Sequence, residues 1–186
     1  EANLVIKKFN KYFEKLDILV CNVGSGKAKK KIPDIKEWHQ SFDINFWSTV
    51  NIINSSKKIL IKSNSSIICI SSICGLENVK GAPIPYSVAK SALNSFVVNQ
   101  SKFFGNFKVR INAIAPGNIM FNGSTWSKKM KKSPSNTKKY INKNVALKIL
   151  GKTSDISNMT LYLASDEAKY ITGSIFKIDG GQLKSW

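Results

Sequence analysis

The chain has 186 residues, 42% of them hydrophobic and 10% aromatic, which is enough for one packed domain and excludes disorder caused by a lack of apolar residues. Lys and Arg outnumber Asp and Glu by 29 to 11, giving a formal net charge of +18, a balance that is typical of nucleic-acid-binding proteins. No apolar run of about 18 residues could span a membrane, and the first residues do not form a signal peptide, so the sequence predicts a soluble, cytoplasmic protein.

Short apolar runs alternate with helical patterns in the first half of the chain. Residues 16–21 are apolar and run into the glycine-containing segment 22–24, which predicts a buried strand followed by a turn. Residues 37–61 carry apolar side chains at a helical period, and 66–72 are rich in isoleucine. We expect a strand, a long helix and a second strand, in that order.

The second half of the chain continues this alternation. Residues 86–104 predict a helix, and 109–115 predict a strand that Pro116 and Gly117 stop. From 118 to 146 the pattern loosens into sequence rich in lysine, serine and asparagine, with scattered apolar residues. This composition indicates a mobile lid or a pair of loosely packed helices.

The chain closes with a helix predicted over 154–164 and a strand predicted over 171–178, which leads into a double glycine. Strands that alternate with helices imply crossover units and a parallel sheet covered on both faces. The sequence thus predicts a single α/β domain, residues 1–186, with a doubly wound parallel sheet.

One helical pair has the chemistry of an acid or base. Tyr86 and Lys90 are four residues apart, so their side chains share one face of the predicted helix. A lysine ammonium beside a phenol favours the phenolate and lowers the pKa of the tyrosine toward neutrality. Because lysine is so frequent in this chain, one such pair carries little weight by itself.

Other polar residues and glycines are predicted to lie near Tyr86 and Lys90. Ser72 ends the strand before this helix, and Asn45 lies in the preceding helix. The segments 22–24 and 116–117 end two other strands. Ligands of open α/β sheets bind beyond the carboxyl ends of the strands, so we expect these residues around one crevice.

These pieces, in this order, resemble the short-chain dehydrogenase/reductase family. The matching segments are 17–24, Asn45, 70–75, 86–90, 109–117, 171–173 and 179–181. The resemblance implies a Rossmann-like fold, NAD or NADP as the cofactor, and hydride transfer between a carbonyl and a secondary alcohol. The four-residue Tyr–Lys spacing and the Asp-Gly-Gly ending look like the 3-oxoacyl-carrier-protein reductase or sugar and polyol dehydrogenase branch, since the enoyl reductase branch spaces the pair more widely.

The family's catalytic roles can be carried over to matching positions. By resemblance, Tyr86 exchanges a proton with the substrate oxygen, and Lys90 holds the nicotinamide ribose and lowers the pKa of Tyr86. Ser72 donates a hydrogen bond to the reacting oxygen, and Asn45 holds a water in the proton relay. We prefer Ser72 to Ser71 because it stands three residues before a glycine, as the family's serine does, and because the two side chains must point to opposite faces of the strand.

The same resemblance assigns the cofactor contacts, and Tyr86 and Lys90 are among them. Asn22 and Gly24 are expected on the adenosine side, with Gly24 allowing a close approach of the backbone. Pro116, Gly117 and Ile119 are expected against the nicotinamide.

The sequence gives weaker signals for the substrate and for the oligomeric state than for the catalytic residues. We expect the substrate, a small-molecule carbonyl or alcohol, to be selected by residues 75–85 and by the lid region 118–146. Phe121 stands where many family members carry a hydroxyl, and with Trp126 and Trp47 it offers apolar surface. The long helices form the subunit interface in relatives, so a homodimer or homotetramer is expected.

The chain departs from the family at its beginning. In the family, a first strand, a glycine-rich phosphate loop and the residue that selects NAD or NADP all precede the strand at 16–21, but only fifteen residues precede it here. These fifteen resemble the helix just before that strand. We therefore expect an exposed strand edge and no pyrophosphate cradle. A catalytically silent relative that acts as a scaffold or binding protein is the alternative function.

Nucleic-acid binding and metal chemistry have less support. All basic residues except Arg110 are lysines, which lack the planar fork that reads bases and phosphates, and they are spread along the chain with runs only at 27–31 and 128–132. A basic nucleic-acid-binding domain is thus the least favoured function. The three cysteines and the single histidine do not have the number and spacing of a zinc site, so no metal is predicted.

Overall fold

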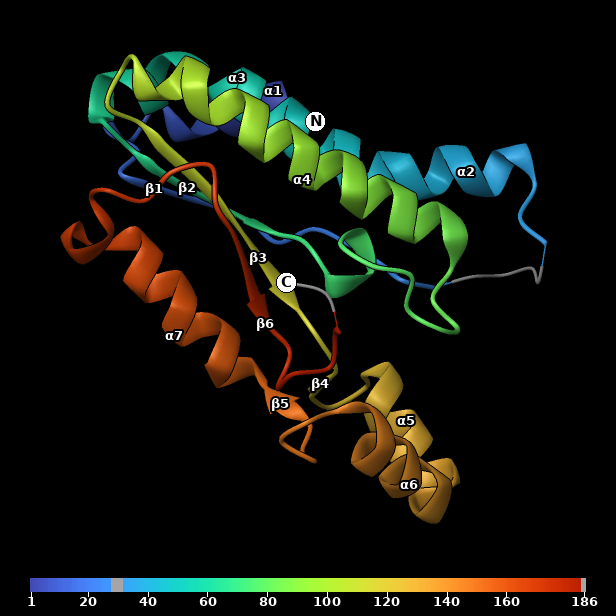
Figure 1. Cartoon of the computed structure of the whole chain (residues 1–186). Helices are drawn as coiled ribbons and strands as arrows, with labels where there is room; N and C mark the ends of the chain where they lie inside the picture. The colour runs from blue at the N-terminus through green and yellow to red at the C-terminus, as the bar shows by residue number, and fades with distance from the viewer. Residues whose placement is uncertain (28–31, 185–186) are drawn as a thin grey trace.

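A four-stranded parallel sheet forms the centre of the computed structural model, which describes residues 1–27 and 32–184 (Figure 1). Most of the lysine run at 27–31 therefore lies outside the described residues. The strand order is β1-β2-β3-β6. These strands are β1 (Ile18–Cys21), β2 (Ser66–Ile70), β3 (Arg110–Pro116) and β6 (Ile175–Ile178). A separate parallel pair joins β4 (Ile119–Met120) to β5 (Gly151–Lys152).

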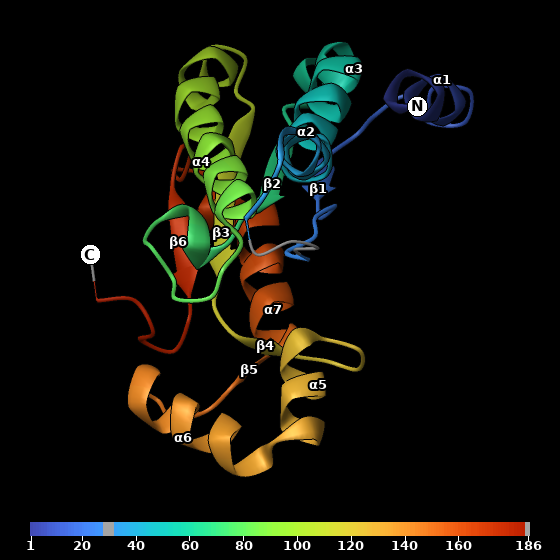
Figure 2. The same ribbon diagram turned by 90° about the vertical axis from the view of Figure 1, so that its right-hand side faces the viewer.

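Helices lie on both faces of the sheet, as predicted. One face is covered by α3 (Ser48–Ser63) and α4 (Ile84–Gly105), and the other by α7 (Thr153–Ala164) (Figure 1). Figure 2 shows α5 (Thr125–Lys132) and α6 (Pro134–Asn144) beyond the carboxyl ends of the strands. Near the N-terminus, α1 (Ala2–Phe9) packs on α3, and α2 (Ile35–Phe42) leads into α3 through a π-helical turn (Asp43–Trp47).

The core has two layers because strand residues alternate between the two faces. In β2, Ile67 and Cys69 are buried with side chains of α3 and α4, whereas Ile68 is buried with Leu163 of α7. Burial on both faces explains why the strands read as continuous apolar runs instead of alternating patterns. The parallel ladder brings Cys21 in register with Cys69.

The edge of the sheet is exposed at β1. Among the described residues, β1 pairs with a strand on one side only. Leu19 and Cys21 face the layer of α3 and α4, but Ile18 and Val20 are 48% and 43% exposed. The predicted exposed strand edge is therefore confirmed for the described part of the chain.

Most predicted elements are present, with differences at their ends. The helix predicted over 37–61 contains the π-helical turn, and the lid region 118–146 contains two helices and the short strand β4. The strand predicted over 171–178 begins only at Ile175. Gly173 has a φ of +74°, which a strand does not allow, and the Thr172 side chain accepts a hydrogen bond from the backbone N–H of Ile111 instead.

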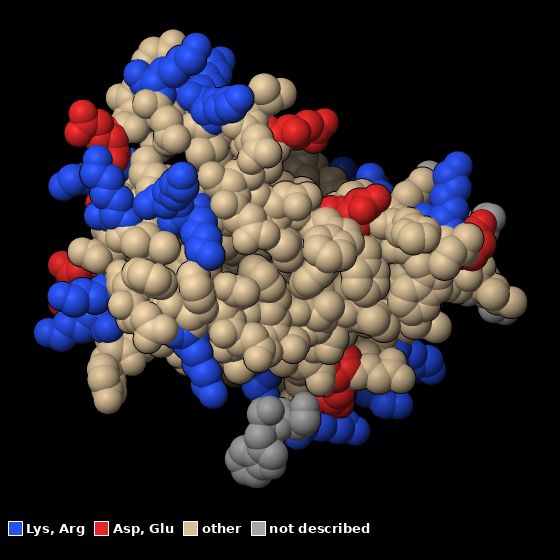
Figure 3. Space-filling view, turned by 90° about the horizontal axis from the view of Figure 1, so that it is seen from above, with Lys and Arg blue, Asp and Glu red and all other residues tan. Residues whose placement is uncertain are grey.

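The outer face of α3 and α4 is largely uncharged at its centre. Figure 3 shows this face from above, with Lys and Arg spread around the rim and neutral side chains over a broad middle area. No helix within the described residues is both long and apolar enough to cross a membrane.

Candidate active site

A cleft of about 850 Å³ opens at the carboxyl ends of the strands, where the sequence predicts the site. It gathers every predicted cofactor and catalytic residue except Asn45, which lines an adjoining cavity of about 800 Å³. The predicted residues that line the cleft are Asn22, Gly24, Ser72, Tyr86, Lys90, Pro116, Gly117 and Ile119. Tyr86 lines both cavities and so stands between them.

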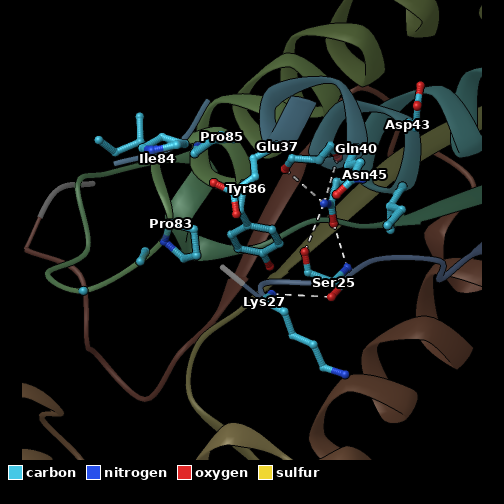
Figure 4. A pocket seen from close by; sticks show the side chains of 15 residues that line it. Ser25, Lys27, Glu37, Gln40, Asp43, Asn45, Pro83, Ile84, Pro85 and Tyr86 are labelled. Carbon is cyan, nitrogen blue, oxygen red and sulfur yellow. Dashed lines mark hydrogen bonds between the residues drawn. The ribbon is translucent and has the colours of Figure 1, made fainter. Parts of the chain in front are cut away.

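Tyr86 lies in the first turn of α4, directly after Pro85. Pro85 suits this position because the first turn of a helix leaves backbone N–H groups without intrahelical partners, and proline has none. Figure 4 shows the Tyr86 ring at the centre of the adjoining cavity, near Pro83 and Ser25. Burial raises the pKa of the Tyr86 phenol above its ordinary value, and a side-chain hydrogen bond with Ser72 partly opposes that shift. The phenol is therefore protonated at neutral pH.

Lys90 lies one helical turn after Tyr86 and is almost completely buried. Its Nζ donates a hydrogen bond of 2.8 Å to the carbonyl oxygen of Ile70, at the end of β2. Burial lowers the pKa of Lys90 from its ordinary 10.5 to about 8. The sequence predicts that Lys90 lowers the pKa of Tyr86, whereas in the structure that pKa is raised, chiefly by burial of the phenol.

The two serines after β2 point to different partners. The Ser72 side chain caps the 3-10 turn Ile73–Gly75 by accepting a hydrogen bond of 3.1 Å from the backbone N–H of Cys74. The Ser71 hydroxyl instead donates a 2.6 Å hydrogen bond to Oδ1 of Asn94 in α4. Of the two serines, Ser72 is the one that acts on the phenol, because it lowers the pKa of Tyr86 against the effect of burial.

Asn45 is fully buried in the π-helical turn and holds the chain that follows β1. Its Oδ1 accepts from the backbone N–H of Ser25 at 2.8 Å, and its Nδ2 donates to the Ser25 carbonyl at 3.1 Å and to the Ser41 carbonyl at 2.9 Å (Figure 4). Its side-chain amide therefore fixes the backbone beside Gly24. The water-holding role expected of Asn45 stays a prediction.

The cleft suits the nicotinamide end of a dinucleotide. A Cβ atom at Gly24 would lie 3.2 Å from both Lys90 Nζ and Asn45 Oδ1, so glycine leaves room for those polar groups at the cleft. Lys90 offers an ammonium and Asn22 an amide beside this glycine. These groups can hydrogen-bond ribose hydroxyls and a carboxamide.

Only one of the three aromatic candidates lines the cleft. Phe121 does so and is half-exposed. Trp126 instead stacks on Tyr140, with ring centroids 5.2 Å apart, and so joins α5 to α6. Trp47 packs against Phe46, with ring centroids 4.9 Å apart, and it is absent from the lining of both cavities.

The sequence did not single out the contribution of α7 to the cleft. Thr153, Ser157 and Thr160 line it, together with Ile156 and Leu161. The three hydroxyl residues recur at the three- and four-residue intervals of one helix face, which is a signal that periodicity could have detected.

The described residues contain no group of three or more His, Cys, Asp or Glu that could hold a metal ion. All three cysteines are free, and Cys21 and Cys69 are buried.

Comparisons with known proteins agree with this geometry. A family model described as enoyl-(acyl carrier protein) reductase matches residues 1–182. Isoepoxydon dehydrogenase patN of Penicillium expansum is 29% identical over 168 residues, which are 90% of this chain and 63% of that protein. The 3-oxoacyl-[acyl-carrier-protein] reductase FabG of Chlamydia trachomatis is 32% identical over 178 residues, covering 95% of this chain and 69% of that protein.

A solved structure of ElxO with NADP bound superposes with a TM-score of 0.89 and 27% identity, covering 99% of this chain and 74% of that one. By contrast, the chain spans only about two thirds of the curated relatives' length, 63% of patN and 69% of FabG.

Proposed function

Because this chain belongs to the short-chain dehydrogenase/reductase family, we propose that it carries the catalytic residues of an NAD(P)-dependent oxidoreductase that interconverts a carbonyl and a secondary alcohol. One observation carries this proposal. Tyr86 and Lys90 of α4 line the same cleft as Ser72, which follows β2.

The environment of Tyr86 favours proton donation. Burial raises the pKa of its phenol, so at neutral pH the group can give a proton to a carbonyl oxygen as that oxygen gains negative charge. The Ser72 hydroxyl can donate a second hydrogen bond to the same oxygen. When bound, the nicotinamide cofactor supplies or accepts the hydride. Lys90 and Asn22 would hold its ribose and carboxamide end beside Gly24.

The substrate class follows from the relatives and the cleft lining. We favour a 3-oxoacyl-carrier-protein reductase-like reaction, since FabG of Chlamydia trachomatis is a 3-oxoacyl-[acyl-carrier-protein] reductase. The four-residue spacing of Tyr86 and Lys90 supports a carbonyl substrate over an enoyl one. Phe121, in the lid region 118–146, would contact the substrate from an apolar side.

Assembly and location are part of the proposal. The neutral outer face of α3 and α4 would join two copies of the chain in a homodimer, or a larger homotetramer (Figure 3). Free, buried Cys21 and Cys69 suit a reducing compartment, which supports the cytoplasm.

The alternative is a catalytically silent scaffold. The exposed edge of β1 favours it, since the described residues place no glycine-rich phosphate loop beside that strand. Titrating NADH and NADPH against the chain, with the fluorescence of the reduced nicotinamide as the readout, separates the two functions. Saturable binding would exclude the silent scaffold.

Affinity for duplex DNA that persists at physiological salt would instead favour the nucleic-acid function.

Replacing the proposed acid tests the proposed function directly. In the full-length protein, we expect Tyr86→Phe to lower turnover by about 10²- to 10⁴-fold, because the substitution removes the proposed proton donor. Cofactor affinity should not change, since the phenol is not its main ligand. Tyr170→Phe, at a fully exposed tyrosine, is the matched control. Turnover within twofold of the parent in Tyr86→Phe would refute the role of Tyr86.

A further inference from the structure

The turn that carries Ser72 is tied at both ends to the helix that carries Tyr86. Before the turn, the Ile70 carbonyl accepts a hydrogen bond from Lys90 Nζ at 2.8 Å. After it, the Gly75 carbonyl accepts one from Asn94 Nδ2 at 3.1 Å. Lys90 and Asn94 are one helical turn apart in α4, so one face of this helix holds both ends.

Asn94 makes a second contact within the same turn. Its Oδ1 accepts the 2.6 Å hydrogen bond from the Ser71 hydroxyl, and the residue is 7% exposed. The amide thus bridges the residue just before Ser72 and the residue three positions after it. This bridge needs a donor and an acceptor on one short side chain, which among the natural residues only asparagine offers at this length.

The packing of Gly75 shows how tightly the turn meets α4. A Cβ atom at Gly75 would lie 2.6 Å from the carbonyl carbon of Lys90 and 2.8 Å from the N atom of Ser91. No side chain larger than hydrogen fits there unless the backbones move apart. The backbone of the turn at Gly75 therefore packs directly on the backbone of α4, and the same residue accepts the hydrogen bond from Asn94.

From these contacts we propose that Asn94 is a positioning residue of the active site: its amide fixes the turn 71–75 on α4 and so sets the distance between Ser72 and Tyr86. The inference rests on the proposed function for its catalytic consequence. Asn94 itself does not line the cleft, so it acts through Ser72 and not on the substrate.

Asn94→Leu is the main test variant. Leucine has the same branching and the same number of heavy atoms, but it leaves both the Ser71 hydroxyl and the Gly75 carbonyl without their partner, so the turn loses these two ties to α4. The matched control is Asn112→Leu. Asn112 is also a buried amide that bridges two groups, since its Nδ2 donates to the Ile171 carbonyl and its Oδ1 accepts from the Ser174 N–H.

The first readout needs no activity. The Tyr86 phenol is titrated in this chain by NMR, with tyrosine carrying ¹³C at Cζ and the Tyr86 signal assigned by its loss in Tyr86→Phe. Because Ser72 opposes the rise in the Tyr86 pKa that burial causes, Asn94→Leu should raise that pKa further. Asn112→Leu should leave it unchanged at a similar loss of stability. Equal shifts in both variants, or a shift in neither, would overturn the proposal.

A milder variant covers the case in which Asn94→Leu does not fold. Ser71→Ala removes one of the two hydrogen bonds of Asn94 and should raise the pKa of Tyr86 in the same direction by less. An unchanged Tyr86 titration in a folded Ser71→Ala chain would also count against the proposal.

The second readout is kinetic. In the full-length protein, Asn94→Leu should lower kcat about 10- to 100-fold with KM within about twofold of the parent, as expected when reacting groups are misplaced. If Tyr86→Phe keeps its turnover while Asn94→Leu still shifts the phenol titration, the proposed function fails and the positioning role stands. If the titration does not move, the positioning role fails whatever the turnover.

Discussion

Lys90 carries its ammonium in a buried environment that disfavours the charged form. Its pKa of about 8, against the ordinary 10.5, means that the folded chain holds this proton less tightly than the unfolded chain does. Below pH 8 both states are protonated, and the buried ammonium costs about 3 kcal/mol of stability. Between pH 8 and 10.5 only the unfolded chain keeps the proton, so this cost disappears as the pH rises. A cofactor ribose would give the ammonium a further hydrogen-bond partner beside the Ile70 carbonyl.

We therefore predict that Lys90→Met stabilises the chain at neutral pH. The gain should be about 2 kcal/mol at pH 7, since about 1 kcal/mol is lost with the hydrogen bond to Ile70. Urea unfolding of both chains at pH 7 and pH 10 measures it, and the gain should shrink at the higher pH. Lys102→Met, at an exposed lysine of the same helix, controls for the change in net charge. A gain that does not depend on pH would contradict the assignment.

Single residues were predictable where a strict period places them. Alternation along β2 separates Ser72 from Ser71, and the structure agrees, with Ser71 bonded to Asn94. The partners of Asn45 were not predictable, because a π-helical turn shifts the helix face by a fraction of a turn and no sequence pattern marks it. Asn94 was missed because a buried asparagine in a helix looks like any surface asparagine in the sequence.

At the scale of elements, the contact between the 3-10 turn Ile73–Gly75 and α4 decides whether the catalytic groups meet. We predict that Gly75→Ala lowers the free energy of unfolding by about 1–3 kcal/mol, because its Cβ would overlap the Lys90 backbone. Thermal unfolding measures this loss. Gly105→Ala, at the end of α4, is the control, since nothing lies within 4 Å of its Cβ and alanine favours helices by about 0.5–1 kcal/mol. Equal effects of both substitutions would show that the close packing at Gly75 is unimportant.

Long helices and strands were easier to predict from the sequence than short ones. The strands of the central sheet and the long helix α4 have enough apolar residues for their period to show. The pair of β4 and β5 has two residues in each strand, too few for any period, and it forms because the lid region brings Ile119 beside Gly151. The segment 171–174 stays hydrogen-bonded to β3, but the positive φ of Gly173 interrupts the extended backbone, so the strand begins only at Ile175.

Helices cover the two faces of the central sheet to different extents. On one face α3 and α4 bury the sheet, but on the other α7 packs chiefly on β2 and β3, so Ile18 and Val20 of β1 remain exposed. Leu161 of α7 is exposed on the same side. The fold of the chain was predictable from its own apolar pattern. The exposed edge was predictable only from the family resemblance, because nothing within Ile18–Cys21 marks it as an edge strand.

An unpaired parallel strand with outward apolar side chains invites pairing between copies. We predict that the chain as given associates into large aggregates, and that Ile18→Lys lowers light scattering several-fold at the same protein concentration. The lysine adds charge repulsion and removes apolar surface at the edge, and it should change the free energy of unfolding by only about 0.5 kcal/mol because the residue is half-exposed. Ile32→Lys adds the same charge at an 83% exposed isoleucine away from β1 and is the control. If it lowers the scattering as much as Ile18→Lys does, the association depends on net charge and not on the edge of β1.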